Sequence, residues 1–209
     1  MSALPPATRE RARPRPQAGF SLVELLVVVA LILILTTMYW GSNSNARRRQ
    51  QQGECRQNLE KMFVALQIYA NDHAGAFPDL PGARTSEAAL SELVPRYTVD
   101  TAVFTCPGSK DSLLPAGEPF RQRRISYAYY MGHRATHTTA VLVTDRQVDP
   151  QPEAANPCVF SRTGKPPGNN HGKDGGNFLF GDGRVQAVPA QTLVPLGLNP
   201  GVVLLGPKP

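Results

Sequence analysis

The hydrophobic positions of the chain form one long apolar run, followed by a second set that is periodic. Between Phe20 and Trp40, 17 of 21 residues are apolar, and the run from Leu25 to Leu35 is unbroken. As an α-helix this segment would rise about 31 Å, close to the roughly 30 Å hydrocarbon core of a bilayer. It is longer than the apolar part of a cleaved secretory signal, and no small-residue cleavage site follows it. The run therefore predicts a membrane-spanning helix.

Beyond this run, apolar residues recur every three or four positions, which predicts one apolar face on a continuing helix. The residues of this face are Cys55, Leu59, Met62, Phe63, Leu66, Tyr69 and Ala70. Small polar residues from Gly41 to Asn45 weaken the helix between the two parts. We expect one long helix from about Phe20 to Asn71, loosened near Gly41. We interpret the Cys, Met and Tyr side chains of its second half as core and not as a cofactor site.

The remainder of the chain predicts short elements joined by many turns, because 20 Pro and 18 Gly occur among the 209 residues. A short helix is expected over Ser86–Val94, and strands over Val103–Cys106, Ile125–Met131 and Thr139–Asp145. Asp182-Gly183 predicts a two-residue hairpin turn that pairs Phe180 with Val185 and Phe178 with Ala187. The tail from Pro189 to Pro209 is expected on the surface or as an edge strand. The predicted fold is α+β and loop-rich: a long transmembrane-plus-amphipathic helix packed against a small antiparallel sheet.

Glu24 does not fit a plain membrane anchor, because a carboxylate within an apolar span is costly unless it is paired or lies near the headgroups. It follows a basic leader, Gly19, Phe20 and three further residues, and it precedes the apolar helix. This pattern resembles the prepilin motif of type IV pilins and of type II secretion pseudopilins. The resemblance implies cleavage between Gly19 and Phe20 by a prepilin peptidase, and N-methylation of Phe20. It also implies that Glu24 pairs with the N-terminal amine of a neighbouring subunit.

The resemblance divides the chain into a cleaved leader (1–19), a transmembrane or filament-core helix (20–41), and a helix continuation with a periplasmic pilin-like domain (42–209). It implies a structural subunit of a periplasmic filament, most similar to a type II secretion pseudopilin. The implied partners are copies of itself or related pseudopilins, the prepilin peptidase, the inner-membrane assembly platform and membrane lipid. The implied location is the inner membrane, crossed once. Two alternatives stay open: a DNA-uptake or adhesive pilin, and a membrane-anchored periplasmic enzyme or binding protein.

Two further segments resemble a pseudopilin-like family. The first reads Cys55, Asn58-Leu59, Tyr69-Ala70-Asn71-Asp72 and Phe77-Pro78. The second is similar to a motif in which a His is followed by nine residues and then Asp-Gly. Here ten residues separate His171 from Asp182, so the spacing is one residue longer, and the sequence assigns His171 no role.

The sequence predicts no catalysis and no bound cofactor, because it contains no GxSxG, HExxH or CxxC motif. The resemblance to major pseudopilins of type II secretion, which often bind calcium in a C-terminal loop, implies calcium as a secondary candidate ligand. Asn169, Asn170, Asp174 and Asp182 offer oxygen ligands, with Asp174 and Asp182 as the candidates. EF-hand spacing is absent, and such residues also serve ordinary turns.

The three cysteines allow three disulfide pairings. In an oxidising periplasm Cys106 and Cys158 could pair, and Cys55 would then be a core thiol. This pairing is one of the three, and the spacing does not select it.

The net charge of +6 does not favour a nucleic-acid partner, since four Arg against Glu10 in residues 1–19 supply half of it. Arg121, Arg123 and Arg124 form a basic cluster that we interpret as solvated surface, with phosphate contact as the alternative.

Overall fold

A computed structural model describes residues 21–118, 120, 123–146, 160, 170–190 and 201–208. The predicted leader, Gly19 and Phe20 lie outside these residues. The chain divides into two compact units, residues 1–44 and 45–209, which are described separately.

One uninterrupted helix, α1 (Leu22–Asp72), confirms the long helix expected from the sequence. It continues through the small polar residues that follow Gly41. It ends where Ala74 and Gly75 adopt positive φ angles of 51° and 82°. The backbone N–H of Gly75 donates to the carbonyl of Ala70 at 2.7 Å and so satisfies one of the last helical carbonyls.

In the second unit, five strands form an antiparallel sheet in the order β4-β3-β2-β1-β5. The strands are β1 (Tyr127–Met131), β2 (Val141–Asp145), β3 (Gly176–Phe180), β4 (Val185–Val188) and β5 (Val203–Leu205). The edge strand β5 confirms that the C-terminal tail contributes to the sheet, since Leu205 pairs with Tyr129. The α+β fold predicted from the sequence is therefore present.

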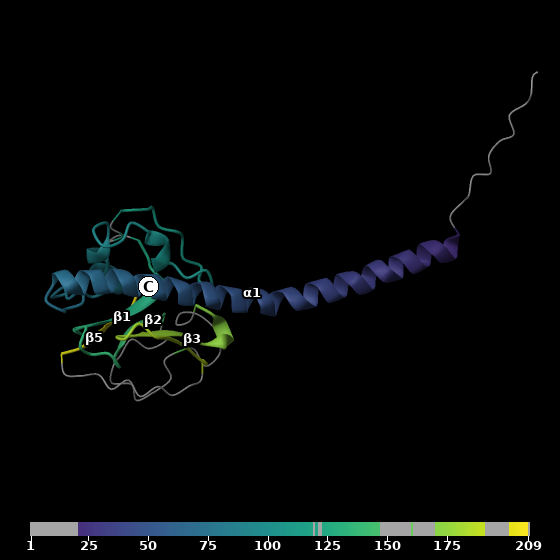
Figure 1. The fold of residues 1–209 in the computed structure, drawn as a ribbon. Helices are drawn as coiled ribbons and strands as arrows, with labels where there is room; N and C mark the ends of the chain where they lie inside the picture. Colours follow the sequence, from purple (N-terminus) through teal and green to yellow (C-terminus); the bar gives the residue numbers. More distant parts are fainter. Residues whose placement is uncertain are drawn as a thin grey trace, which may run out of the picture. The chain divides into compact units, whose positions relative to one another are not determined.

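The second half of α1 lies between the sheet and the segment that carries the short helices (Figure 1). Leu59, Met62 and Leu66 are fully buried in one apolar cluster. That cluster also contains Tyr127, Tyr129, Val143, Leu179 and Val185 of the sheet, and Leu90, Leu93 and Phe104 of the short helices. The periodic apolar face of the helix is thus the centre of the core.

Two predicted elements between α1 and β1 differ from the structure. Val103–Cys106 was predicted as a strand, but Thr101–Phe104 forms a 3-10 helix, η2. The Asp100 side chain accepts a hydrogen bond from the Ala102 N–H and so favours the helical turn over an extended strand. The predicted helix at Ser86 is divided into α2 (Ser86–Leu90) and the 3-10 helix η1 (Ser91–Leu93).

The predicted register of the last hairpin was wrong by one residue. Leu179 pairs with Val185, and Phe178 pairs with Gln186. Gly183, with φ of 86°, takes the left-handed position that closes a three-residue loop, in place of the second position of a two-residue turn. A shift of one residue reverses the faces of a strand. Leu179 and Val185 therefore face the α1 core, whereas Phe178 packs with Phe160 and Val188 in a separate cluster.

Candidate functional site

The first half of α1 presents apolar side chains that nothing in the described chain covers. From Leu22 to Tyr39 the mean hydropathy is 2.6, which is sufficient in length and composition for a membrane span. Leu22 is 79% exposed and Leu35 is 65% exposed. Such a continuous apolar surface requires another apolar environment, either lipid or the helices of other subunits.

Glu24 lies in the first turn of this helix and is exposed. A negative charge in the first turn interacts favourably with the partial positive charge of the helix N-terminus. Glu24 is the one charged residue between Leu22 and Tyr39, so it marks a unique position on an otherwise apolar surface.

A second candidate site is a buried group of two thiols, a carboxylate and an imidazole. One ligand atom from each of Cys55, Cys106, Asp145 and His171 lies within 4.8 Å of the others. The Cys55 Sγ lies 3.1 Å from Asp145 Oδ1, and the Cys106 Sγ lies 3.4 Å from His171 Nε2. The His171 Nε2 lies 3.5 Å from Asp145 Oδ2. All four residues are buried. We call these residues the Cys–Asp–His cluster.

Four separate parts of the fold supply this cluster. Cys55 comes from α1, Cys106 follows η2, and Asp145 ends β2. His171 precedes the short 3-10 helix η3 (Gly172–Asp174). Gly108 allows the His171 ring to approach, because a Cβ at Gly108 would lie 2.7 Å from His171 Nδ1 and 2.6 Å from the Asn170 carbonyl oxygen.

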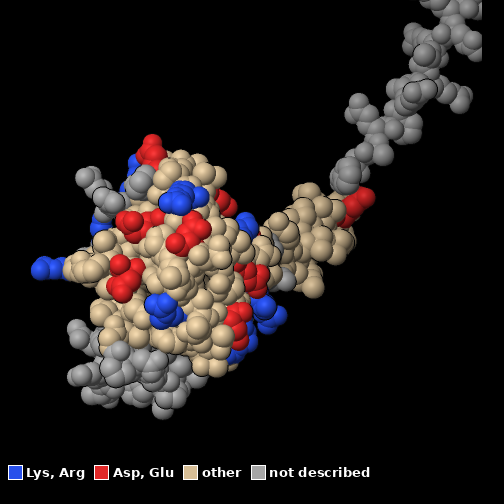
Figure 2. Space-filling model, turned by 60° about the vertical axis from the view of Figure 1, so that its left-hand side comes forward, with Lys and Arg blue, Asp and Glu red and all other residues tan. Residues whose placement is uncertain are grey.

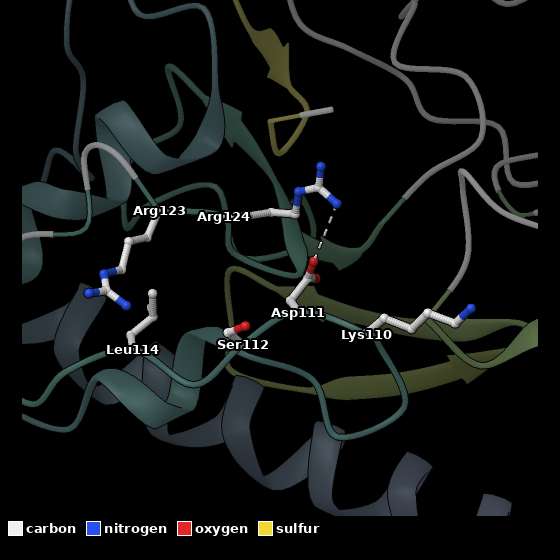
Figure 3. A pocket seen from close by; sticks show the side chains of 6 residues that line it. All are labelled: Lys110, Asp111, Ser112, Leu114, Arg123 and Arg124. Atoms are coloured by element: carbon white, nitrogen blue, oxygen red, sulfur yellow. Dashed lines mark ion pairs between the residues drawn. The ribbon is translucent and has the colours of Figure 1, made fainter.

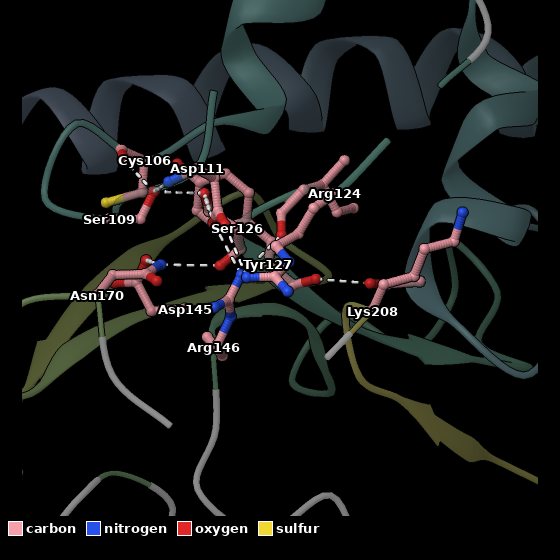
Figure 4. A network of polar contacts seen from close by, with 12 residues as sticks. Cys106, Ser109, Asp111, Arg124, Ser126, Tyr127, Asp145, Arg146, Asn170 and Lys208 are labelled. Atoms are coloured by element: carbon pink, nitrogen blue, oxygen red, sulfur yellow. Dashed lines mark hydrogen bonds and ion pairs between the residues drawn. The ribbon is translucent and has the colours of Figure 1, made fainter. Parts of the chain in front are cut away.

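Neighbouring polar groups hold the Asp145 carboxylate in place. The Asn170 Nδ2 donates to Asp145 Oδ1 at 2.8 Å and to the Ser126 carbonyl at 2.8 Å (Figure 4). The Asn177 N–H and Nδ2 donate to Asp145 Oδ2 at 2.6 and 3.1 Å. The Tyr127 hydroxyl lies 3.1 Å from the Cys55 sulfur.

The close contacts alter the acidity of the cluster. Burial would lower the pKa of His171, but its hydrogen bonds to Asp145 and Cys106 raise it to about 10. Burial would raise the pKa of Asp145, but the hydrogen bond and charge of His171, together with hydrogen bonds from Cys55 and Asn170, lower it overall. Burial raises the pKa of Cys55, and its contact with Cys106 adds to the rise. Burial would also raise the pKa of Cys106, but hydrogen bonds with Cys55 and His171 lower it.

The structure places the other predicted site residues apart from this cluster. Asp174 and Asp182 lie at opposite ends of β3, and each lies beside an arginine, Arg48 at 3.4 Å and Arg184 at 3.9 Å respectively. A five-residue strand spans roughly 17 Å, so the two carboxylates would not share one calcium ion. Calcium binding stays an untested prediction.

Cys158, which forms one of the three disulfide pairings open from the sequence with Cys106, lies outside the described residues, so that pairing is also untested. Cys55 and Cys106 are free thiols in the structure. His171, which the sequence assigned no role, belongs to the Cys–Asp–His cluster. His133 and His137 lie in the connection between β1 and β2.

The predicted basic cluster is partly neutralised by a buried carboxylate. Arg124 lies 3.8 Å from Asp111, and Arg146 donates to Asp111 at 2.7 Å. Lys110, Ser112, Leu114 and Arg123 complete the lining of a pocket beside this ion pair (Figure 3). Arg121 lies outside the described residues.

On the face shown in Figure 2, acidic and basic residues of the second unit are interspersed. This face therefore carries no patch of one sign that would favour binding to a polyanion.

Sequence reasoning missed Cys55 and Asp145 as members of the Cys–Asp–His cluster. Cys55 is 90 residues from Asp145, and Cys106 is 65 residues from His171. No short metal-binding motif links them, and the helical periodicity at Cys55 indicated a core position. The one available signal was His171, in a segment similar to a family motif.

Comparison with known proteins gives a family match at the N-terminus. Residues 14–40 match the prokaryotic N-terminal methylation motif. No curated protein and no solved structure matches the chain significantly. The match covers the last residues of the predicted leader (14–19), Phe20, Glu24 and the exposed apolar half of α1. The chain therefore carries the prepilin-type N-terminal segment of the type IV pilin-like family.

Proposed function

We propose that the chain is a structural subunit of a periplasmic filament belonging to a type II secretion system. The observation that carries the proposal is the exposed apolar helix Leu22–Tyr39, which bears the single acid Glu24 and lies within the matched methylation motif. A helix used as a lipid anchor has no need of an acid at this position. A helix that packs against copies of itself can use one to fix its register.

Assembly would proceed from the membrane. The prepilin peptidase removes residues 1–19 on the cytoplasmic side and methylates the new amine of Phe20. With the assembly platform, apolar helices then leave the lipid and pack against one another. This exchange keeps their apolar surface out of water throughout. In the filament Glu24 pairs with the N-terminal amine of a neighbouring subunit, and this pairing offsets the cost of a carboxylate in an apolar interior.

The second unit would form the outer surface of the filament in the periplasm. The mixed charge on the face shown in Figure 2 suits a domain that meets other copies and other proteins. The Cys–Asp–His cluster is buried, so it does not resemble an accessible catalytic centre. These features support a structural role over an anchored enzyme.

The proposal is tested first by the intact mass and N-terminal residue of the protein extracted from its native membrane. We expect a chain that begins at a methylated Phe20. A chain that still begins at Met1 would contradict the proposal.

The second test compares Glu24→Ala with Glu60→Ala. Both remove a carboxylate from α1, but Glu60 is exposed in the second unit, where it pairs with Arg56 at 3.0 Å. The assay is chemical cross-linking of neighbouring subunits in cells that express each variant. We expect Glu24→Ala to abolish the cross-linked products and Glu60→Ala to leave them unchanged. Function retained in Glu24→Ala would instead indicate a simple membrane tether.

Secretion is distinguished from the alternative of DNA uptake by the phenotype of a deletion strain. A type II secretion subunit is required for the release of folded periplasmic proteins. A DNA-uptake pilin is required for transformation, and its subunits would show salt-sensitive DNA binding.

A further inference from the structure

The buried Cys–Asp–His cluster combines the ligand types of a transition-metal site. Two thiolates, one imidazole and one carboxylate are all ligands of zinc, and four protein ligands are typical of structural zinc sites. The four ligand atoms already lie within 4.8 Å of one another. These four residues come from separate segments of the chain and are brought together only by the tertiary fold.

Three of the separations between candidate ligand atoms are close to those of a tetrahedral zinc site. Zinc bonds of about 2.0–2.3 Å at tetrahedral angles separate neighbouring ligand atoms by roughly 3.3–3.8 Å. The Cys106 Sγ to His171 Nε2 distance is 3.4 Å, and the His171 Nε2 to Asp145 Oδ2 distance is 3.5 Å. The Cys55 Sγ to Asp145 Oδ1 distance is 3.1 Å, a few tenths of an ångström shorter. Cys55 and His171 contact different oxygens of Asp145, and the four ligand atoms lie within 4.8 Å of one another, a limit wider than a tetrahedral edge. Side-chain movements that bring one Asp145 oxygen and the other three atoms to a common centre would form the tetrahedron.

The groups around the cluster are suited to support metal ligands. Asn170 and Asn177 donate hydrogen bonds to the two oxygens of Asp145, and the Tyr127 hydroxyl lies within hydrogen-bond distance of the Cys55 sulfur. Zn²⁺ with two thiolates, a carboxylate and a neutral imidazole would carry one net negative charge. Hydrogen-bond donors around such a site stabilise that charge and orient the ligands.

We propose that Cys55, Cys106, Asp145 and His171 bind one structural zinc ion. The ion connects α1 to the end of β2 and to the segments that contain Cys106 and His171. Because all four ligands come from the protein and are buried, the site has a stabilising and not a catalytic role. This inference is independent of filament assembly, and it extends the predicted role of Cys55 from core packing to ligation.

A disulfide is the competing arrangement of these thiols. A bond between Cys55 and Cys106, or between Cys106 and Cys158, would remove sulfur ligands and leave no thiolate pair for a metal. The Cys–Asp–His geometry favours the metal, because a disulfide would not need the imidazole and the carboxylate directed at the same point.

The test uses the full-length protein, extracted in detergent, stripped with a chelator under reducing conditions and titrated with Co²⁺, which reports coordination by its visible spectrum. We expect about one Co²⁺ per chain, with the intense bands of a tetrahedral site and thiolate charge transfer in the near ultraviolet. Zn²⁺ should displace the Co²⁺ and remove these bands. The protein purified without chelator should also contain about one zinc per chain.

Matched variants assign the ligands. Cys106→Ser and His171→Gln should each weaken Co²⁺ binding at least tenfold and shift the visible bands, whereas Cys158→Ser and His133→Gln should leave binding unchanged. If a variant fails to fold, the visible spectrum of the Co²⁺-loaded wild-type protein still shows whether the metal site exists. The proposal is overturned if the wild-type protein takes up no Co²⁺, if its spectrum lacks thiolate bands, or if the native protein has Cys55 or Cys106 in a disulfide. None of these outcomes depends on whether Glu24 directs assembly.

Discussion

Asn177 donates two hydrogen bonds to the Asp145 carboxylate, one from its backbone and one from its side chain. Its backbone N–H lies 2.6 Å from Asp145 Oδ2, and its Nδ2 lies 3.1 Å from the same oxygen. Asp145 is fully buried, so each of these bonds compensates for the loss of water around a charge. The first residues of β3 thus fix the position of the last residue of β2.

Replacing Asn177 by Ala keeps the backbone N–H bond but removes the Nδ2 bond to Asp145. It should therefore lower the free energy of unfolding by about 1.5–3 kcal/mol, the usual range for one hydrogen bond to a charged group. The matched control is Asn58→Ala, which removes a bond from Nδ2 to the neutral Thr105 carbonyl at 3.2 Å. That change should cost about 0.5–1.5 kcal/mol. Urea denaturation of the detergent-extracted protein, followed by the near-ultraviolet circular dichroism of its buried tyrosines, measures both. Equal losses would contradict a special role of Asn177.

Gly108 and Gly53 should respond in opposite directions to alanine. At Gly108 the added Cβ would meet the Asn170 carbonyl oxygen at 2.6 Å, so Gly108→Ala should destabilise the protein by about 1–3 kcal/mol. At Gly53, within α1, a Cβ meets nothing within 4 Å. Gly53→Ala should stabilise by roughly 0.5–1 kcal/mol, because alanine favours the helix. Urea denaturation measures the free energy of unfolding of both variants. An unchanged free energy of unfolding in Gly108→Ala would show that the segment around His171 can move away from the added Cβ.

Features that depend on local pattern were predictable from the sequence. The helix α1 follows from the apolar run and from the spacing of Leu59, Met62 and Leu66, and these signals need no knowledge of the rest of the fold. The hairpin at Asp182-Gly183 was also predictable, but its register was not. The same Gly183 can close either a two-residue or a three-residue loop, and packing on the sheet faces decides between them.

The Cys–Asp–His cluster depends on contacts between residues far apart in sequence. Cys55 occupies a core position of an amphipathic helix, and Asp145 ends an ordinary strand, so neither stands out by its neighbours. Only the pairing of β2 with β3 and the packing of α1 on the sheet bring them together. Sequence spacing carried no information on these arrangements.

Leu66 and Ile68 provide a test of which face of α1 forms the core. Leu66 is fully buried, whereas Ile68 is 48% exposed. Leu66→Ala should cost about 2–5 kcal/mol because it leaves a cavity between the helix and the sheet. Ile68→Ala should change the free energy of unfolding by no more than about 0.5 kcal/mol in the isolated protein. If Ile68→Ala proved the more damaging, the helix would face the sheet differently from the structure described.

His133 should make the protein less stable in mild acid. Burial lowers the pKa of His133, and the neighbouring His137, whose Nδ1 lies 3.3 Å from that of His133, lowers it further. Above pH of about 6.5 the side chain is neutral in both folded and unfolded chains. As the pH falls below this value the unfolded chain binds a proton that the folded chain resists, so stability decreases. Denaturation at pH 8 and pH 5 should therefore show a larger loss in the wild type than in His133→Gln. Equal losses, or a larger loss in the variant, would mean that His133 is protonated without cost in the folded protein.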